Sequence, residues 1–253
     1  MLHVEATGSG PRLVLVHGFT QTGRSWGRFA ELIEPGRQVV RVDLPGHGAS
    51  GGLRADLAET ASLVLEAAVA TGPGDTCPID LLGYSLGARV ALHAVLDHPG
   101  AVRRLILIGG TPGIEDPEVR AARRRRDEAM ADALEAEGDV ERFLDRWVAA
   151  PMFWGLRDPG LAERRRNTAA GLASSLRLAG TGAQRPLWER LRALDAPTLL
   201  LAGADDIRFA AVAARMARAM PNAVVSLVPG AGHAAHLAQP DLTARTVLRF
   251  LGG

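Results

Sequence analysis

The sequence predicts an α/β fold in which helices flank a mostly parallel central sheet and a helical segment is inserted as a cap. Apolar runs of strand length alternate with helical stretches up to about residue 110 and again from residue 195, a rhythm typical of βαβ units. Between residues 111 and 194 the rhythm stops, and helical patterning with two arginine-rich clusters replaces it. We therefore expect a core of residues 1–110 and 195–253 and an inserted cap of residues 111–194.

Short apolar runs without polar alternation carry the prediction of the sheet. Such runs are typical of strands that are buried on both faces of a parallel sheet. The expected strands span residues 12–17, 38–43, 77–82, 102–108, 197–202 and 223–228. Helical spacing and flanking breakers predict core helices over residues 25–33, 53–71, 85–98, 209–220 and 240–251.

The composition indicates an ordinary globular protein. The 253 residues carry a net charge of +1, so neither a nucleic acid nor a membrane is expected as a partner. No run of about 18 apolar residues predicts a membrane span, and residues 1–5 do not resemble a secretory signal. We therefore expect a cytoplasmic protein and favour a monomer. The single cysteine, Cys77, is expected to be buried without a chemical role.

The segment Gly83-Tyr84-Ser85-Leu86-Gly87 lies between an expected strand and an expected helix. A serine in this context is held on a sharp turn, with its hydroxyl exposed above the sheet. Such a turn leaves no room for side chains at the two glycines. The segment therefore predicts Ser85 as a catalytic residue, although the pattern by itself also fits a loop whose serine caps a helix.

An activated serine requires a histidine that takes its proton and a carboxylate that orients the histidine. Asp205 and Asp206 directly follow an expected strand, and His233 follows the last one. The carboxyl ends of parallel strands share one edge of a sheet, so these side chains are expected near Ser85. His236 is a weaker alternative to His233, because it already lies in the apolar run that enters the last helix.

The segment His17-Gly18-Phe19 ends the first expected strand at the same edge of the sheet. The backbone N–H groups of Phe19 and Leu86 are predicted to form an oxyanion hole, which binds a developing negative charge on oxygen. No histidine pair has the H-E-x-x-H spacing, and no expected strand is followed by G-x-G-x-x-G. Neither a metal nor a dinucleotide cofactor is therefore predicted.

These motifs, together with the segment from Asp43 to Ser50, resemble the α/β-hydrolase superfamily over essentially the whole chain. The resemblance implies the α/β-hydrolase fold with Ser85, Asp206 and His233 as a catalytic triad. Further segments resemble a narrower family, the 2-succinyl-6-hydroxy-2,4-cyclohexadiene-1-carboxylate synthases of menaquinone biosynthesis. They are Tyr84–Arg89, Arg120–Arg123, Trp147–Phe153, Arg164–Asn167, Gln184–Trp188 and Asp206–Phe209.

This family resemblance implies a carbon–oxygen lyase that eliminates pyruvate from 2-succinyl-5-enolpyruvyl-6-hydroxy-3-cyclohexene-1-carboxylate, with the triad serine as base and without a cofactor. The small-molecule substrate carries three carboxylates, which the planar guanidinium of arginine binds bidentately. The resemblance assigns Arg89, Arg123 and Arg164 as carboxylate ligands, and Tyr84 and Trp147 as residues that shape the pocket. Arginine also occupies all of positions 123–126 and 164–166, so the sequence leaves open which member of each cluster faces the pocket.

Two other classes of function fit the same sequence. A serine hydrolase acting on esters or carbon–carbon bonds of a small carboxylated substrate would use the same triad. A non-catalytic binding protein with this fold would not need the triad at all. Ester turnover without pyruvate formation would favour the hydrolase, and failure of Ser85 to react with a fluorophosphonate would favour the binding protein.

Overall fold

The computed structural model describes residues 1–71, 78–153, 156 and 160–252. Cys77 lies outside the described residues, so the prediction that it is buried stays a prediction. No helix in these ranges combines the length and the apolar character that crossing a membrane requires.

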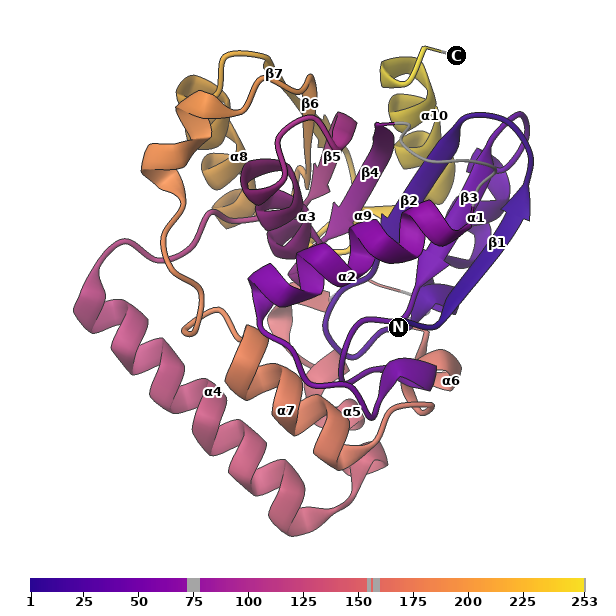
Figure 1. Cartoon of the computed structure of the whole chain (residues 1–253). Coiled ribbons are helices and arrows are strands. Elements are labelled where there is room, and N and C mark those ends of the chain that lie inside the picture. The colour runs from indigo at the N-terminus through magenta and orange to yellow at the C-terminus, as the bar shows by residue number, and fades with distance from the viewer. Residues whose placement is uncertain (72–77, 154–155, 157–159, 253) are drawn as a thin grey trace.

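A seven-stranded sheet lies at the centre of the molecule, in the order β1-β3-β2-β4-β5-β6-β7 (Figure 1). The strands are β1 (Val4–Gly8), β2 (Arg12–Val16), β3 (Gln38–Val42), β4 (Ile79–Tyr84), β5 (Val102–Ile108), β6 (Thr198–Gly203) and β7 (Ala223–Val228). The strands from β3 to β7 pair in parallel, whereas β1 runs antiparallel to β3. The mostly parallel sheet confirms the predicted fold class. The sequence does not predict β1, because its five residues include a glutamate, a threonine and a glycine.

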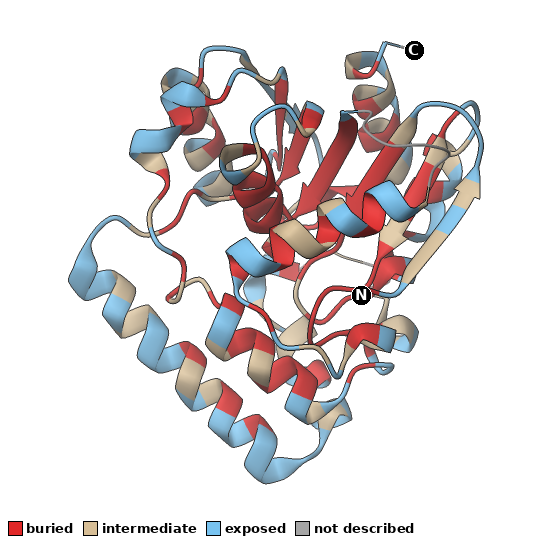
Figure 2. Cartoon of the chain, in the orientation of Figure 1, coloured by how far each residue is buried: buried red, intermediate tan, exposed pale blue. Residues whose placement is uncertain are grey.

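Helices cover both faces of this sheet. One face packs against α2 (Leu57–Ala70), α3 (Leu86–Asp97) and α8 (Ile207–Ala219), and the other against α1 (Gly27–Ile33), α9 (Ala235–Ala238) and α10 (Pro240–Phe250). The central strands are buried on both faces, as Figure 2 shows. The helix expected from residue 53 begins at Leu57, because Asp56 caps it and accepts hydrogen bonds from the N–H groups of Ala58 and Glu59.

Between β5 and β6 the chain leaves the sheet and forms helices. These are α4 (Pro117–Glu137), α5 (Val140–Val148), α6 (Leu161–Arg164) and α7 (Ala169–Ala179), and short 3-10 helices span Pro151–Phe153 and Trp188–Ala193. Two further 3-10 helices, Gly23–Trp26 and Gly48–Ser50, belong to loops of the sheet. The long helix α4 lies beside α7 (Figure 1), and Leu134, Phe143, Leu144 and Leu172 form a small apolar core of their own. This helical segment faces the edge of the sheet that carries Ser85.

Candidate active site

Ser85 lies on the turn between β4 and α3. Its backbone has φ 52° and ψ −103°, a strained conformation that a residue with a side chain adopts only when its surroundings impose it. A Cβ at Gly83 would lie 2.3 Å from the carbonyl oxygen of Gly87, and a Cβ at Gly87 would lie 1.9 Å from that of Val16. Both positions therefore require glycine, because backbone packs directly against backbone on each side of the serine.

A chain of hydrogen bonds joins Ser85 to His233 and Asp206. The Nε2 atom of His233 lies 3.1 Å from Ser85 Oγ, and its Nδ1 atom lies 2.9 Å from Asp206 Oδ2. The other carboxylate oxygen of Asp206 accepts the N–H of Phe209 at 3.1 Å. An ionised Asp206 accepts a hydrogen bond from the Nδ1–H of His233, which leaves Nε2 free to take the proton of the serine.

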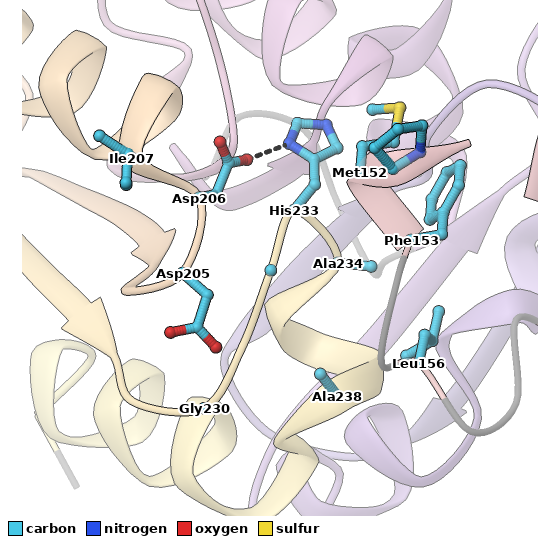
Figure 3. A pocket seen from close by; sticks show the side chains of 12 residues that line it. Met152, Phe153, Leu156, Asp205, Asp206, Ile207, Gly230, His233, Ala234 and Ala238 are labelled. Atoms are coloured by element: carbon cyan, nitrogen blue, oxygen red, sulfur yellow. Dashed lines mark hydrogen bonds and ion pairs between the residues drawn. The ribbon is translucent and has the colours of Figure 1, made fainter. Parts of the chain in front are cut away.

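The structure also distinguishes between the two neighbouring aspartates. Figure 3 shows the hydrogen bond from Asp206 to His233, whereas Asp205 lies on the other side of the loop and points away from the ring. Burial by itself would raise the pKa of Asp206. The hydrogen bonds from His233 and from the N–H of Phe209 outweigh burial and lower that pKa below its ordinary value.

Close packing holds the ring of His233 in place. The ring of Phe209 lies 4.4 Å from it between centroids, and the ring of Tyr84 lies 5.4 Å from it on another side. Gly109 has φ 59°, and a Cβ there would lie 2.8 Å from Cε1 of His233. Glycine at this position thus gives the imidazole room beside the end of β5.

The residues predicted to form the oxyanion hole, Leu86 and Phe19, differ in their backbone setting. The N–H of Leu86 lies in the first turn of α3, where N–H groups have no acceptor within the helix. The N–H groups on either side of Phe19 are both engaged, since Gly18 donates to Gln21 Oε1 and Thr20 donates to His47 Nε2. Phe19 and Leu86 both line the cavity that contains Ser85. This arrangement is compatible with the predicted oxyanion hole.

Two buried histidines brace the loop that carries Phe19. His17 Nε2 accepts the N–H of Leu44 at 3.0 Å, and its Nδ1 lies 2.8 Å from the carbonyl oxygen of Gly18. His47 accepts the N–H of Thr20, and its Nδ1 lies 3.0 Å from the carbonyl oxygen of Pro45. Burial lowers the pKa of His17 to about 4 and that of His47 to about 3, so both rings are neutral near pH 7.

Ser85 opens into a cavity of about 190 Å³ between the sheet and the helical segment. We call this cavity the chamber. Its charged lining consists of three arginines, Arg89, Arg123 and Arg208, and one carboxylate, Asp127. The remaining lining residues are Phe19, Ser85, Leu86, Gly109, Thr111, Trp147, Met152, Ser175, Leu176, Ala179, Gly180, Thr181, Phe209 and His233. The chamber therefore combines a reactive serine with a positively charged wall.

Arg89 lies one helical turn after Ser85 and is only 7% exposed. One guanidinium nitrogen donates to the carbonyl oxygen of Ala179 at 2.7 Å. Burial, reinforced by the neighbouring positive charge of Arg123, lowers the pKa of Arg89 to about 10. Arg123 reaches the same chamber from α4, and its Nε donates to Asp127 Oδ1 at 2.8 Å. A carboxylate bound between these arginines would offset the cost of burying Arg89.

The structure places two of the predicted substrate residues elsewhere. Arg164, 1% exposed, is not among the residues that line the chamber, and it donates hydrogen bonds to the carbonyl oxygen of Phe19 and to Thr20 Oγ1. Tyr84 is buried and is not among the residues that line the chamber, and its ring lies 4.4 Å from that of His236. Their roles toward a substrate stay predictions, whereas Trp147 does line the chamber.

Sequence reasoning did not single out Arg208, Asp127 or Ser175, which also line the chamber. Arg208 could have been found from the sequence, because it lies two residues after Asp206, on the first turn of the helix that the aspartate caps. The sequence indicates Asp127 less strongly. It follows Arg123 by four residues, which is the spacing of an ion pair along one face of a helix.

A second, larger cavity of about 460 Å³ is also lined by His233 (Figure 3). Its walls include the apolar side chains of Met152, Phe153 and Leu156 and the carboxyl groups of Asp205 and Asp206. Met152 and His233 line both cavities. This second cavity carries two acidic side chains, whereas the chamber carries three arginines and one acidic side chain. An anion is therefore favoured in the chamber rather than in the second cavity.

Within the described ranges, no group of three or more histidine, cysteine or acidic side chains is placed to hold a metal ion. The expectation of a reaction without metal or cofactor stays a prediction.

Comparison with known proteins identifies the family. A model of the alpha/beta hydrolase family matches residues 13–246. A 2-succinyl-6-hydroxy-2,4-cyclohexadiene-1-carboxylate synthase from Enterobacter sp. (strain 638) is 32% identical, and the match covers 95% of this chain and 92% of the relative. The protein of that name from Klebsiella pneumoniae subsp. pneumoniae is 34% identical, with 95% and 94% covered. The chain belongs to this synthase family.

A solved structure agrees with membership of the synthase family. MenH from S. aureus superposes with a TM-score of 0.89 at 30% identity, and the match covers 99% of this chain and 98% of that one. The family resemblance and the α/β-hydrolase fold predicted from the sequence are thus confirmed.

Proposed function

We propose that this protein eliminates pyruvate from 2-succinyl-5-enolpyruvyl-6-hydroxy-3-cyclohexene-1-carboxylate to give 2-succinyl-6-hydroxy-2,4-cyclohexadiene-1-carboxylate. The relatives named for this product support the proposal. The observation that carries it is the position of Ser85, which opens into a chamber with Arg89 and Arg123 in its wall. A substrate with three carboxylates requires such cationic groups, whereas a neutral ester would gain nothing from them.

In the proposed reaction Ser85 acts as a base. His233, oriented by Asp206, draws the hydroxyl proton, and the serine oxygen removes the acidic C–H proton beside the succinyl carbonyl. The electron pair of this C–H bond forms a double bond, the ring double bond shifts, and the C–O bond to the enolpyruvyl group breaks. The departing enolate takes up a proton and becomes pyruvate, so no oxidant or reductant is needed.

The N–H groups of Phe19 and Leu86 would stabilise the enolate oxygen that forms on the succinyl carbonyl. A donor of this kind typically contributes about 3 kcal/mol to the stability of the transition state. Arg89 and Arg123 would bind carboxylates, and residues 111–194 would act as the cap that selects the substrate. Trp147 of this segment also lines the chamber and would limit its shape.

The same triad and oxyanion hole would serve a hydrolase that forms an acyl-enzyme, so the two activities must be separated by experiment. The test supplies the enolpyruvyl intermediate and follows pyruvate release by the wild type, by Ser85→Ala and by Ser9→Ala. Ser9 lies in an exposed loop and serves as the matched control. We expect Ser85→Ala to lower kcat by at least about a thousandfold and Ser9→Ala to leave it unchanged.

Either of two results would overturn the proposal. The first is undiminished release by Ser85→Ala. The second is no release by the folded wild type together with ester turnover that Ser85→Ala abolishes, which would identify a serine hydrolase.

A further inference from the structure

A third arginine lies in the wall of the chamber. Arg208 belongs to the first turn of α8, two residues after Asp206, and lines the same cavity as Ser85, Arg89 and Arg123. Arg123 is paired with Asp127, and Arg89 donates to a backbone carbonyl. Among the described residues, none forms a hydrogen bond or ion pair with Arg208, although its charge contributes to the lowered pKa of Asp206. Its guanidinium therefore keeps its donors available to a ligand.

Aromatic packing holds Arg208 on the histidine side of the chamber. Its Cζ lies 5.6 Å from the centroid of the Phe209 ring, which in turn lies 4.4 Å from the ring of His233. The other two arginines are anchored toward the C-terminal end of α7, since Arg89 donates to Ala179 and Asp127 also accepts the N–H of Gly182. The three guanidinium groups thus come from three different helices, and Arg208 is anchored apart from the other two.

We propose that Arg208 binds one carboxylate of the substrate at the His233 side of the chamber. The proposal rests on the proposed function, whose substrate has three carboxylates. With Arg89 and Arg123, Arg208 completes a set of three cations for three anions. A carboxylate bound by Arg208 fixes the substrate beside His233 and Ser85, so the acidic proton is presented to the serine oxygen.

The test compares Arg208→Gln with Arg218→Gln. Arg218 lies on the same helix and is exposed, and it does not line the chamber, so it controls for the loss of one positive charge. We expect Arg208→Gln to raise KM for the intermediate by about tenfold or more, since a charge-assisted hydrogen bond is lost, and to change kcat by less than KM. We expect Arg218→Gln to change neither.

Analogues that each lack one carboxylate show which one Arg208 binds. Their dissociation constants are measured with the Ser85→Ala protein, with and without Arg208→Gln. For the analogue that lacks the carboxylate bound by Arg208, the Arg208→Gln substitution should have little further effect on the dissociation constant. The affinity for each of the other analogues should fall about tenfold. Equal losses for all analogues would overturn the proposal. So would an unchanged KM, or a shifted pH profile of kcat/KM with unchanged binding, which would indicate an effect through Asp206 alone.

The two proposals fail in different measurements. Absence of pyruvate release by the wild type overturns the proposed function. Equal KM values for Arg208→Gln and Arg218→Gln in an active enzyme overturn only the role of Arg208.

Discussion

The chamber has two sides, the edge of the sheet and the helices of residues 111–194, which we call the cap side. On the sheet side the residues that face the chamber are fixed by close backbone contacts, whereas on the cap side they are single side chains that project from helices. Ser85 sits between two glycines that touch neighbouring backbone, and His233 lies against Gly109. Arg123 and Trp147 project from α4 and α5, and the one described ion pair of Arg123 is with Asp127 on its own helix. The comparison predicts that a substitution in the triad and a substitution of Arg123 on a cap helix should affect different kinetic constants.

The largest effect is expected on the sheet side, from Asp206→Asn. The amide cannot keep His233 in the tautomer whose Nε2 accepts the serine proton, so kcat should fall by about a thousandfold to ten-thousandfold. The folded structure and KM should change little. Asp205→Asn is the matched control, because Asp205 points away from the histidine (Figure 3). Steady-state pyruvate release checks this prediction, and a similar loss in both variants would contradict it.

A smaller effect, on KM, is expected on the cap side from Arg123→Gln. Loss of one charged hydrogen bond to a substrate carboxylate should raise KM by about tenfold and leave kcat nearly unchanged. Arg124→Gln is the control, since Arg124 is exposed and pairs with Glu128 on the outer surface of α4. A large fall in kcat with constant KM would show that the two sides of the chamber are not separable.

A third effect concerns stability in mild acid rather than catalysis, and it arises on the sheet side. Burial lowers the pKa of His17 to about 4 and that of His47 and His236 to about 3. Below pH 6.5 the unfolded chain binds protons at these imidazoles and the folded protein does not. Each histidine should therefore lower the free energy of unfolding by up to about 1.4 kcal/mol per pH unit as the pH falls toward 4.

Urea unfolding at pH 7.5 and pH 5 measures this loss, and His236→Phe isolates one contributor. Among the described residues, neither ring nitrogen of His236 has a hydrogen-bond partner, and the ring packs 4.7 Å from that of Trp26. Phenylalanine keeps this aromatic packing and cannot titrate. We expect the variant to lose less stability than the wild type between the two pH values. Equal losses would contradict the low pKa of His236.

The sheet was predictable because its strands are continuous apolar runs, and the order of the motifs along the chain led to Ser85, Asp206 and His233. Parallel strands bring their carboxyl ends to one edge, so position along the sequence translates directly into position in space. β1 was not predictable in this way, because its pairing with β3 rather than its composition makes it a strand.

The cap residues were harder to place, because consecutive helix residues point about 100° apart and only tertiary packing decides which face is buried. Sequence resemblance put forward Arg164, whereas the structure has Arg164 bracing the loop at Phe19 and Arg208 lining the chamber. Arg208 belongs to the core, whereas two of the three carboxylate ligands that the resemblance put forward, Arg123 and Arg164, belong to the inserted segment.

The 148 residues that separate Ser85 from His233 have a consequence for biosynthesis. The ribosome completes the strained serine turn well before it adds β6, β7 and the loop that carries the histidine. Asp206 follows β6 and His233 follows β7, so Ser85 has neither partner until these two strands have joined the sheet. If the triad acts as proposed, we expect the nascent chain to be unreactive at Ser85 until the last strand has been assembled.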